Sequence, residues 1–163
     1  REKVYNIHMT EEKKDINLVH IVLGHSYLFY FAGLLVAVLF DTFNHIPIMN
    51  MRSDNQLGLI LLIAGTILIL WAQKTTRTGH HRKSELPYTR FARGPYTITR
   101  SPTHMGIGIM LLGLSFIFNS LALLVSTMLC FFITRYIFIR KEEKLLVDRY
   151  GDDYRAYQKK VRM

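Results

Sequence analysis

The chain of 163 residues contains four long apolar runs, at residues 19–40, 57–72, 105–118 and 121–139. A helix needs about 20 apolar residues to cross the hydrocarbon core of a bilayer. The first and fourth runs reach this length, whereas the second and third must borrow flanking residues. Short apolar runs are also typical of buried helices in soluble proteins, but four runs in so short a chain favour a membrane protein. We therefore expect an all-α integral membrane domain with about four transmembrane helices.

Basic residues are distributed unevenly, and their pattern predicts how these helices cross the membrane. The formal net charge is +9, and 16 of the 21 Lys and Arg residues lie from Lys74 onward, with none in the turn at Asn119-Ser120. Cytoplasmic loops carry an excess of Lys and Arg. We expect a multi-pass protein with both termini cytoplasmic, whose basic residues attract anionic membrane lipids. Nucleic-acid binding is not expected, because no aromatic and basic surface module accompanies the charge.

The apolar runs and loops indicate one membrane domain over residues 1–163. Its first part, 1–73, holds a polar tail and two spans. Its second part, 74–163, begins with a long non-apolar loop at 74–100 and continues into a helical hairpin and a cytosolic tail. Long loops between compact elements are often functional. We therefore look for a cofactor pocket on the cytosolic side of this second part.

Small and aromatic residues predict where the helices pack. Gly106 and Gly113 are seven residues apart and share one helix face, where another helix can approach closely. Gly151 is expected to end the helix that follows the hairpin. An apolar and aromatic face then runs through the tail and is expected to pack it onto the membrane domain; its members are Leu146, Tyr150, Tyr154, Tyr157 and Val161.

Neither a metal site nor an internal disulfide is expected. The only cysteine, Cys130, lies inside the fourth apolar run. His80 and His81 are adjacent, but no carboxylate or cysteine stands at a metal-ligand spacing from them.

Two adjacent carboxylates, Glu142 and Glu143, directly follow the fourth apolar run. So close to lipid they are costly unless something cationic pairs with them. A bound cation, Arg140 and Lys144 are the candidates, and the alternative is a solvated interfacial helix. Arg135, inside the run itself, either marks a functional site or extends to the lipid headgroups.

A second polar group stands at the mouth of the third apolar run. Pro102 suits a first helical turn, and Ser101 suits the N-cap before it. The free N–H groups and dipole of a helix start favour an anion, and Arg100 adds a fixed cation. His104, one turn further, is either a hydrogen-bonding or basic group for a ligand or a polar residue at the interface.

Four short segments surround the hairpin in a set order: Gly94-Pro95-Tyr96, Arg100-Ser101-Pro102-Thr103-His104-Met105-Gly106, Glu142-Glu143, and Tyr150-Gly151-Asp152-Asp153-Tyr154-Arg155-Ala156-Tyr157. Together they resemble the integral-membrane methyltransferases related to isoprenylcysteine carboxyl methyltransferase and the phospholipid methyltransferases. The resemblance covers roughly residues 78–162. Two positions depart from the family pattern, since Ser101 replaces a His or Asn and His104 replaces a Tyr.

The resemblance implies S-adenosyl-L-methionine as methyl donor and a lipid or small lipophilic acceptor. Carried over by position, the residues that hold the donor are Tyr96, Arg100, Ser101, Pro102, His104 and Glu142. The same pocket would be lined by His81, Tyr88, Thr89, Arg90 and Phe91. On the acceptor side the resemblance points to Arg135 or Arg140, and an amine acceptor would lose its proton to Glu143 or His104.

Elementary chemistry agrees with these roles. The donor is a sulfonium cation with an amino-acid end, so that Glu142 can bind its ammonium and the helix start at Ser101 its carboxylate. The face of Tyr96 can lie near the sulfonium. Two other functions remain open, namely a sterol-reductase-like enzyme that uses a nicotinamide cofactor and a non-catalytic membrane scaffold. Such reductases are larger, and the changes at Ser101 and His104 are the only support for a scaffold.

Overall fold

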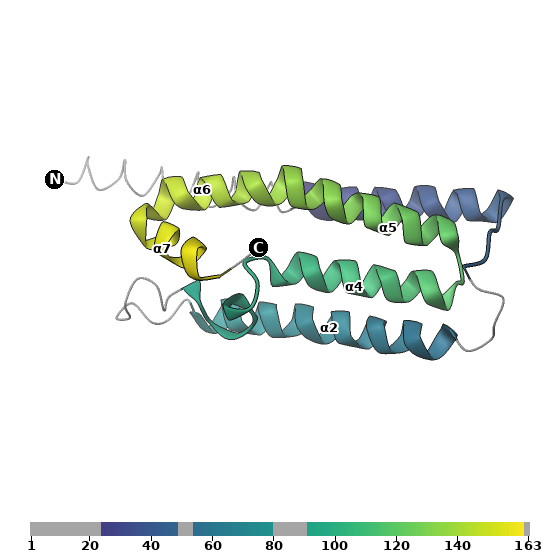
Figure 1. Cartoon of the computed structure of the whole chain (residues 1–163), viewed down its shortest axis with the longest axis horizontal. Coiled ribbons are helices and arrows are strands. Elements are labelled where there is room, and N and C mark those ends of the chain that lie inside the picture. Colours follow the sequence, from purple (N-terminus) through teal and green to yellow (C-terminus); the bar gives the residue numbers. More distant parts are fainter. Residues whose placement is uncertain (1–23, 49–53, 80–90, 162–163) are drawn as a thin grey trace.

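A computed structural model describes residues 24–48, 54–79 and 91–161 of the chain. These residues form helices and connecting segments, with no strand among them. The first helix is described over Gly24–Phe43 and is called the N-terminal helix below. The others are α2 (Asp54–Gly79), the 3₁₀ turn η1 (Gly94–Thr97), α4 (Pro102–Ile117), α5 (Leu121–Ile133), the π-helical segment η2 (Thr134–Ile139), α6 (Arg140–Tyr150) and α7 (Asp152–Lys160) (Figure 1).

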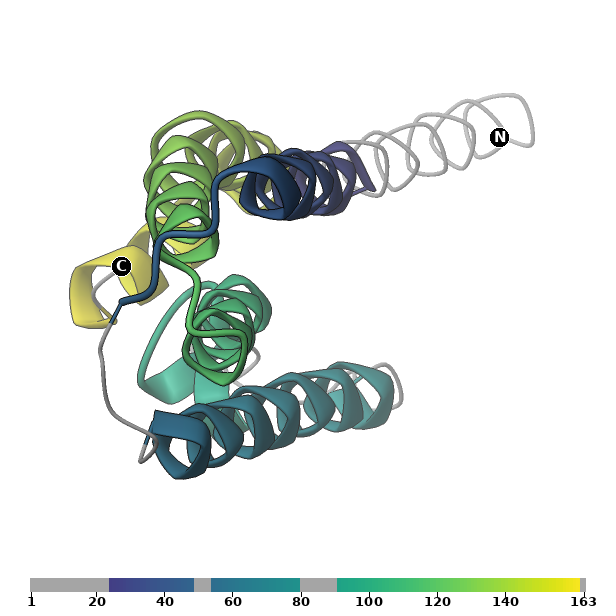
Figure 2. The same cartoon turned by 90° about the vertical axis from the view of Figure 1, so that its right-hand side faces the viewer.

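The long helices lie in two pairs (Figures 1 and 2). The N-terminal helix runs beside α5, where Ser126 Oγ donates a hydrogen bond of 2.9 Å to the carbonyl of Gly33. In the other pair, α2 runs beside α4. Buried Tyr30, Leu111 and Cys130 pack together and join the N-terminal helix to the hairpin of α4 and α5. The core of the bundle therefore lies between the two pairs.

Glycines allow α2 and α4 to approach backbone to backbone. A Cβ at Gly65 would lie 2.6 Å from the carbonyl oxygen of Gly106, and a Cβ at Gly58 would lie 2.7 Å from that of Gly113. All four glycines are buried. The prediction that Gly106 and Gly113 share a packing face is thus confirmed, and α2 supplies the matching pair.

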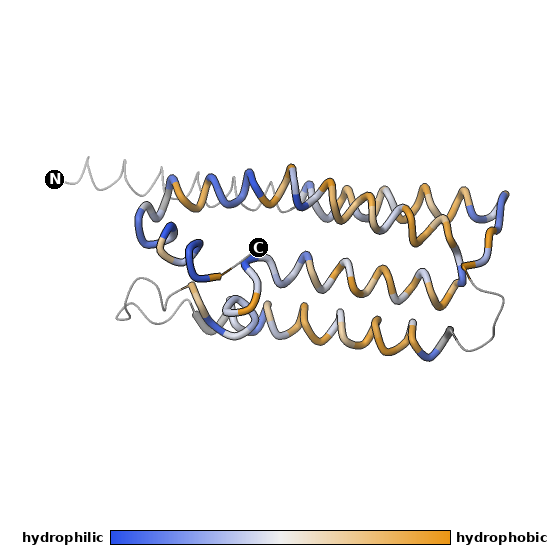
Figure 3. Tube along the Cα trace, in the orientation of Figure 1, coloured by the Kyte–Doolittle hydropathy of each residue, from blue (hydrophilic) through white to orange (hydrophobic). Residues whose placement is uncertain are grey.

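Among the described residues, three helices are long and apolar enough to cross a membrane: Gly24–Phe43, Gln56–Thr76 and Leu121–Asp148. The apolar helix α4 has 16 residues, about 24 Å, against a hydrocarbon core of about 30 Å. Large apolar side chains cover the outside of the bundle, for example Leu28, Ile60 and Leu129, each more than half exposed. The all-α membrane fold expected from the apolar runs is confirmed, with three full-length spans among the described residues and α4 as a shorter apolar helix (Figure 3).

One end of the bundle carries the short loops. Asn119, at φ 47°, makes the turn between α4 and α5, and its side-chain oxygen accepts a hydrogen bond of 2.9 Å from the backbone N–H of Ile48. Ser120 Oγ donates to Asp41 Oδ1 at 2.7 Å. These bonds tie the loop after the N-terminal helix to the hairpin turn. The expected turn at Asn119-Ser120 is confirmed.

The other end carries the polar elements η1, α6 and α7, blue in Figure 3 where they are most hydrophilic. The sequence prediction of a loop from residue 74 was wrong for its first six residues, because α2 continues to Gly79. Gly94, at φ 51°, lies against Trp71 and Thr75 and so packs η1 on this last part of α2.

The tail folds back on itself at Gly151, which has φ 57° and ends α6 as expected. Helix α7 follows and brings Tyr154, Tyr157 and Val161 into one buried cluster. Phe91 fills its centre, with its ring centroid 5.0 Å from that of Tyr150. The apolar and aromatic face predicted from the sequence does pack, and it packs against the segment that precedes η1.

Candidate active site

The polar end of the bundle brings together side chains from four elements. The N-terminal helix supplies Tyr27, η1 supplies Tyr96, the start of α4 supplies His104, and α6 supplies Glu142. The rings of Tyr27 and His104 lie 5.8 Å apart between centroids. Tyr27 is also close enough to Glu142 and Tyr96 to interact with them electrostatically. Three of these four residues were expected at the site from the sequence.

The start of α4 has the form expected of an anion-binding helix terminus. Ser101 is its N-cap and Pro102 its first residue. Ser101 is 8% exposed and His104 3% exposed, yet Ser101 Oγ and His104 Nδ1 have no hydrogen-bond partner among the described residues. Buried polar atoms without partners are uncommon because each costs free energy. These two atoms are therefore candidates for binding a ligand.

The adjacent carboxylates of α6 have different surroundings. Glu143 Oε1 lies 2.6 Å from Arg100 Nη1, with both side chains largely buried. Arg135 and Arg140 are also close enough to interact with Glu143. For Glu142, by contrast, the described part of the chain provides no ion pair with a basic residue, and the neighbouring Glu143 carboxylate is close enough to interact with it. Glu142 is thus the carboxylate available to a cationic ligand.

Two arginines predicted to face a methyl acceptor lie next to this site. Arg135 belongs to η2 and is half-buried, whereas Arg140 begins α6 and is exposed. The guanidinium of Arg140 lies 5.1 Å from the centre of the Tyr136 ring. The anion facing both arginines in the described structure is Glu143. A π-helical segment inside a long helix is often found at a functional site.

Tyr96 is held from two sides. Its carbonyl accepts a hydrogen bond of 2.7 Å from the hydroxyl of Tyr157 in α7, and its own hydroxyl lies 3.2 Å from Thr76 Oγ1 in α2. The tail helix therefore fixes η1 against the bundle. A further bond, from Gln158 Nε2 to Glu143 Oε2 at 3.4 Å, joins α7 to α6.

Not all residues predicted to line the pocket can be placed. Phe91 belongs to the aromatic cluster of the tail, with Tyr154 5.4 Å away between ring centroids. Burial raises the pKa of Tyr154, and the nearby Glu143 carboxylate raises it further, so that its phenol stays neutral. The remaining predicted residues, His81, Tyr88, Thr89 and Arg90, lie outside the described residues.

Tyr27 was missed by the sequence analysis. It lies inside an apolar run whose residues carry no motif, and three residues further on Tyr30 faces the same way, 6.2 Å from His104 between ring centroids. Residues at this spacing share one face of a helix. Two tyrosines on one face of an apolar helix were the available signal, but nothing in the sequence indicated that His104 would be their partner.

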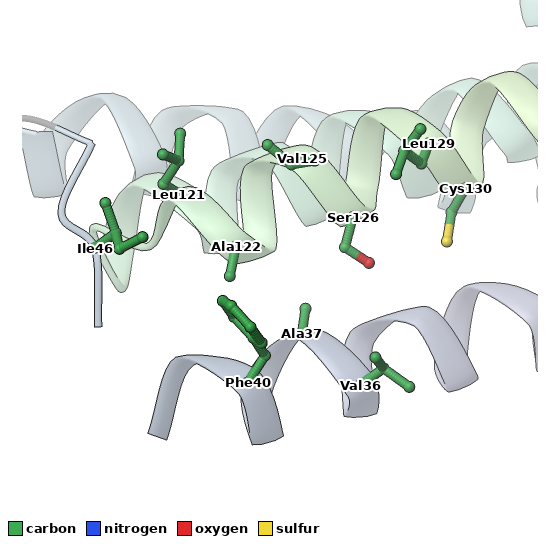
Figure 4. Close-up of a pocket in the computed structure, with 10 residues that line it drawn as sticks. All are labelled: Val36, Ala37, Phe40, Ile46, Leu121, Ala122, Val125, Ser126, Leu129 and Cys130. Atoms are coloured by element: carbon green, nitrogen blue, oxygen red, sulfur yellow. The ribbon is translucent and has the colours of Figure 1, made fainter. Parts of the chain in front are cut away.

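An apolar groove lies elsewhere in the described part of the chain. It has a volume of about 470 Å³ and opens between the N-terminal helix and α5, away from the polar end (Figure 4). Its walls are apolar apart from Ser126 Oγ, and they are formed by Val36, Ala37, Phe40, Ile46, Leu121, Ala122, Val125, Ser126, Leu129 and Cys130. No charged group reaches it, so we place the chemistry at the polar end and not in this groove.

Fold and site together define a helical integral-membrane protein with a polar site at one end of its bundle. The chain belongs to the phospholipid methyltransferase family, whose family model matches residues 54–153. This match confirms the family resemblance drawn from the motifs and extends it to α2. Neither the comparison with curated proteins nor that with solved structures gives a match.

Proposed function

We propose that this protein transfers a methyl group from S-adenosyl-L-methionine to a lipid or small lipophilic acceptor at the cytosolic face of the membrane. The observation that carries the proposal is that one end of the bundle holds both a carboxylate suited to a cation and a helix start suited to an anion. Glu142 is a carboxylate with no basic partner among the described residues. Its neighbour Glu143 pairs with Arg100, which directly precedes a helix start with two buried, unpartnered polar atoms. A ligand with both a cationic and an anionic end matches these features.

The residues present fit this donor. Its ammonium group would bind to Glu142, and its carboxylate to the N–H groups at the start of α4, with Ser101 Oγ and Arg100 nearby. His104 Nδ1 offers a further hydrogen bond to the ligand. When bound, the donor supplies an electrophilic methyl group.

Methyl transfer by direct displacement asks the protein mainly to align the two reactants and to exclude water. Tyr96 is suited to alignment because Tyr157 and Thr76 hold it on both sides. The aromatic cluster of the tail covers the segment before η1 and limits access of water from that side. The site would therefore be rigid where it contacts the donor.

The acceptor side is assigned to Arg135 and Arg140, which lie at the junction of the last membrane helix and α6. An acidic acceptor would bind there without a general base, since a carboxylate or thiolate already carries the reacting electron pair. An amine acceptor has to lose a proton, and the sequence nominated His104 and Glu143 for that step. Glu143 is engaged with Arg100, whereas His104 Nδ1 has no hydrogen-bond partner among the described residues and can serve either the donor or an amine acceptor, but not both at once.

Binding measurements on the full chain, purified in detergent, test the proposal. We expect calorimetry to detect binding of S-adenosyl-L-methionine and no binding of a reduced nicotinamide dinucleotide. Radiolabelled methyl groups should then appear in lipophilic material when the protein is incubated with membranes. Binding of the nicotinamide alone would support the reductase alternative, and binding of neither would support a scaffold.

A further inference from the structure

The N-terminal helix lies outside the family match at residues 54–153, yet it contributes to the site. Tyr27 stands 5.8 Å from His104 between ring centroids, with the rings inclined at 38°. It also faces Glu142 of α6 and Tyr96 of η1 closely enough to interact with both. One phenol thus touches or approaches every element that forms the site.

Tyr30 shows by contrast that Tyr27 is not simply part of the core. Tyr30 is 4% exposed and packs with Leu111 and Cys130 between the helices. Tyr27, three residues closer to the polar end, is only half-buried and lies within electrostatic range of the Glu142 carboxylate. An aromatic residue next to an unpaired carboxylate is a typical environment for a cationic ligand, because ring faces and carboxylates both attract positive charge.

We propose that Tyr27 forms the aromatic wall that faces the sulfonium of the methyl donor, so that the N-terminal helix completes the site. This inference rests on the function proposed above. Glu142 accounts for the donor's ammonium group and the start of α4 for its carboxylate, while Tyr96, held by Tyr157 and Thr76, offers one ring near the sulfonium. The ring of Tyr27, 5.8 Å from that of His104 between centroids and within electrostatic range of Glu142, is placed to supply a second one from the N-terminal helix.

Two ligands separate this role from a packing role. S-adenosylhomocysteine has the donor's amino-acid and adenosine groups but a neutral thioether in place of the sulfonium. A ring that faces the sulfonium stabilises the cation by an amount that corresponds to about threefold to thirtyfold in affinity. Tyr27→Leu should therefore weaken binding of the donor by that factor and change binding of the thioether by less than about twofold.

Matched variants complete the experiment. Tyr27→Phe keeps the ring and should retain donor affinity within about threefold. Phe31→Leu removes a ring from the same helix at a position that is 56% exposed, and it should leave both affinities unchanged. Calorimetry on the full chain in detergent provides every value.

Each outcome has a distinct meaning. An equal loss of affinity for both ligands in Tyr27→Leu would assign Tyr27 to packing and overturn the inference. Unchanged affinity for the donor would overturn it as well. Because the comparison is made between two ligands on one variant, partial loss of folded protein does not imitate the expected result. If the wild-type chain bound neither ligand, the proposed function itself would fail.

Discussion

Arg100 and Glu143 form an ion pair of 2.6 Å between the segment that precedes α4 and helix α6, with side chains that are 14% and 12% exposed. The pair joins two elements that are 43 residues apart in sequence. Removing one partner of a buried pair leaves the other charge uncompensated, which is costly.

We therefore expect Glu143→Gln to lower the free energy of unfolding by about 3 kcal/mol, the lower end of the range for buried pairs. Unfolding in mixed detergent micelles measures this change. The control is Arg155→Ala, which breaks the exposed pair of 3.6 Å with Asp152 and should have no measurable effect. Equal stability of the wild type and Glu143→Gln would show that Arg100 is satisfied by solvent.

Glu142 tests the donor site directly. Glu142→Gln removes the negative charge but keeps the shape of the side chain, so it should weaken donor binding by roughly 1.5–3 kcal/mol. Calorimetry with S-adenosyl-L-methionine measures the change, and Asp148→Asn, an exposed acid on the same helix, is the control. Undiminished affinity in Glu142→Gln would place this carboxylate on the solvated face.

The arginines separate donor binding from acceptor binding. Arg135→Ala or Arg140→Ala should impair methyl transfer but leave donor affinity within about threefold, because an interaction made only with the acceptor adds nothing to the binary complex. Turnover with saturating donor and the donor affinity are the two measurements. If both variants kept full turnover in anionic lipid, the arginines would serve only to anchor the helix at the headgroups.

The glycine contact between α2 and α4 should tolerate no added methyl group. At Gly65 the new Cβ would meet backbone atoms of Gly106 and Met110, which cannot rotate away. We expect Gly65→Ala to destabilise the protein by about 1–3 kcal/mol, the usual cost of overpacking. Gly24→Ala is the matched control, since nothing lies within 4 Å of its new Cβ. Both are compared by thermal unfolding, and equal midpoints would mean that the helices separate more easily than this contact implies.

Topology provides a further prediction. Thr97 in η1 and Asp152 in α7 belong to the polar end, whereas Asn44 belongs to the end with the short loops. In a Cys130→Ser background, single cysteines at the first two positions should react with a membrane-impermeant reagent from the cytosolic side, and a cysteine at Asn44 from the opposite side. Labels at Thr97 and Asp152 on opposite sides would be incompatible with the hairpin.

Much of the fold followed from patterns of short range. The apolar runs, the turn at Asn119 and the helix end at Gly151 depend on composition or on a single backbone conformation, and all three are present in the structure. The extension of α2 to Gly79 was missed because its polar residues show no apolar period. In the structure Gly94 packs on Trp71 and Thr75 of this helix, a long-range contact that the local sequence does not reveal.

Of the candidate site, the sequence analysis nominated only residues that lie in recognisable motifs. Ser101, His104 and Glu142 could be nominated because they lie in segments with recognisable residues. The different roles of Glu142 and Glu143 depend on which one meets Arg100 across the bundle, and adjacent residues in a sequence give no sign of that. Tyr27 enters through tertiary packing alone.

The π-helical segment η2 has a consequence for how such a site can arise. A π-helical turn accommodates one additional residue in an otherwise α-helical run. Each residue of an α-helix turns the chain by about 100°, so this addition sets the direction in which everything after Ile139 faces, including Glu142 and Glu143. Loss of a single codon within Thr134–Ile139 would turn both carboxylates by about 100° and part Glu143 from Arg100, while leaving the membrane helices almost as long as before. Gain and loss of the site are thus separated by one genetic step, and the membrane anchor survives either change.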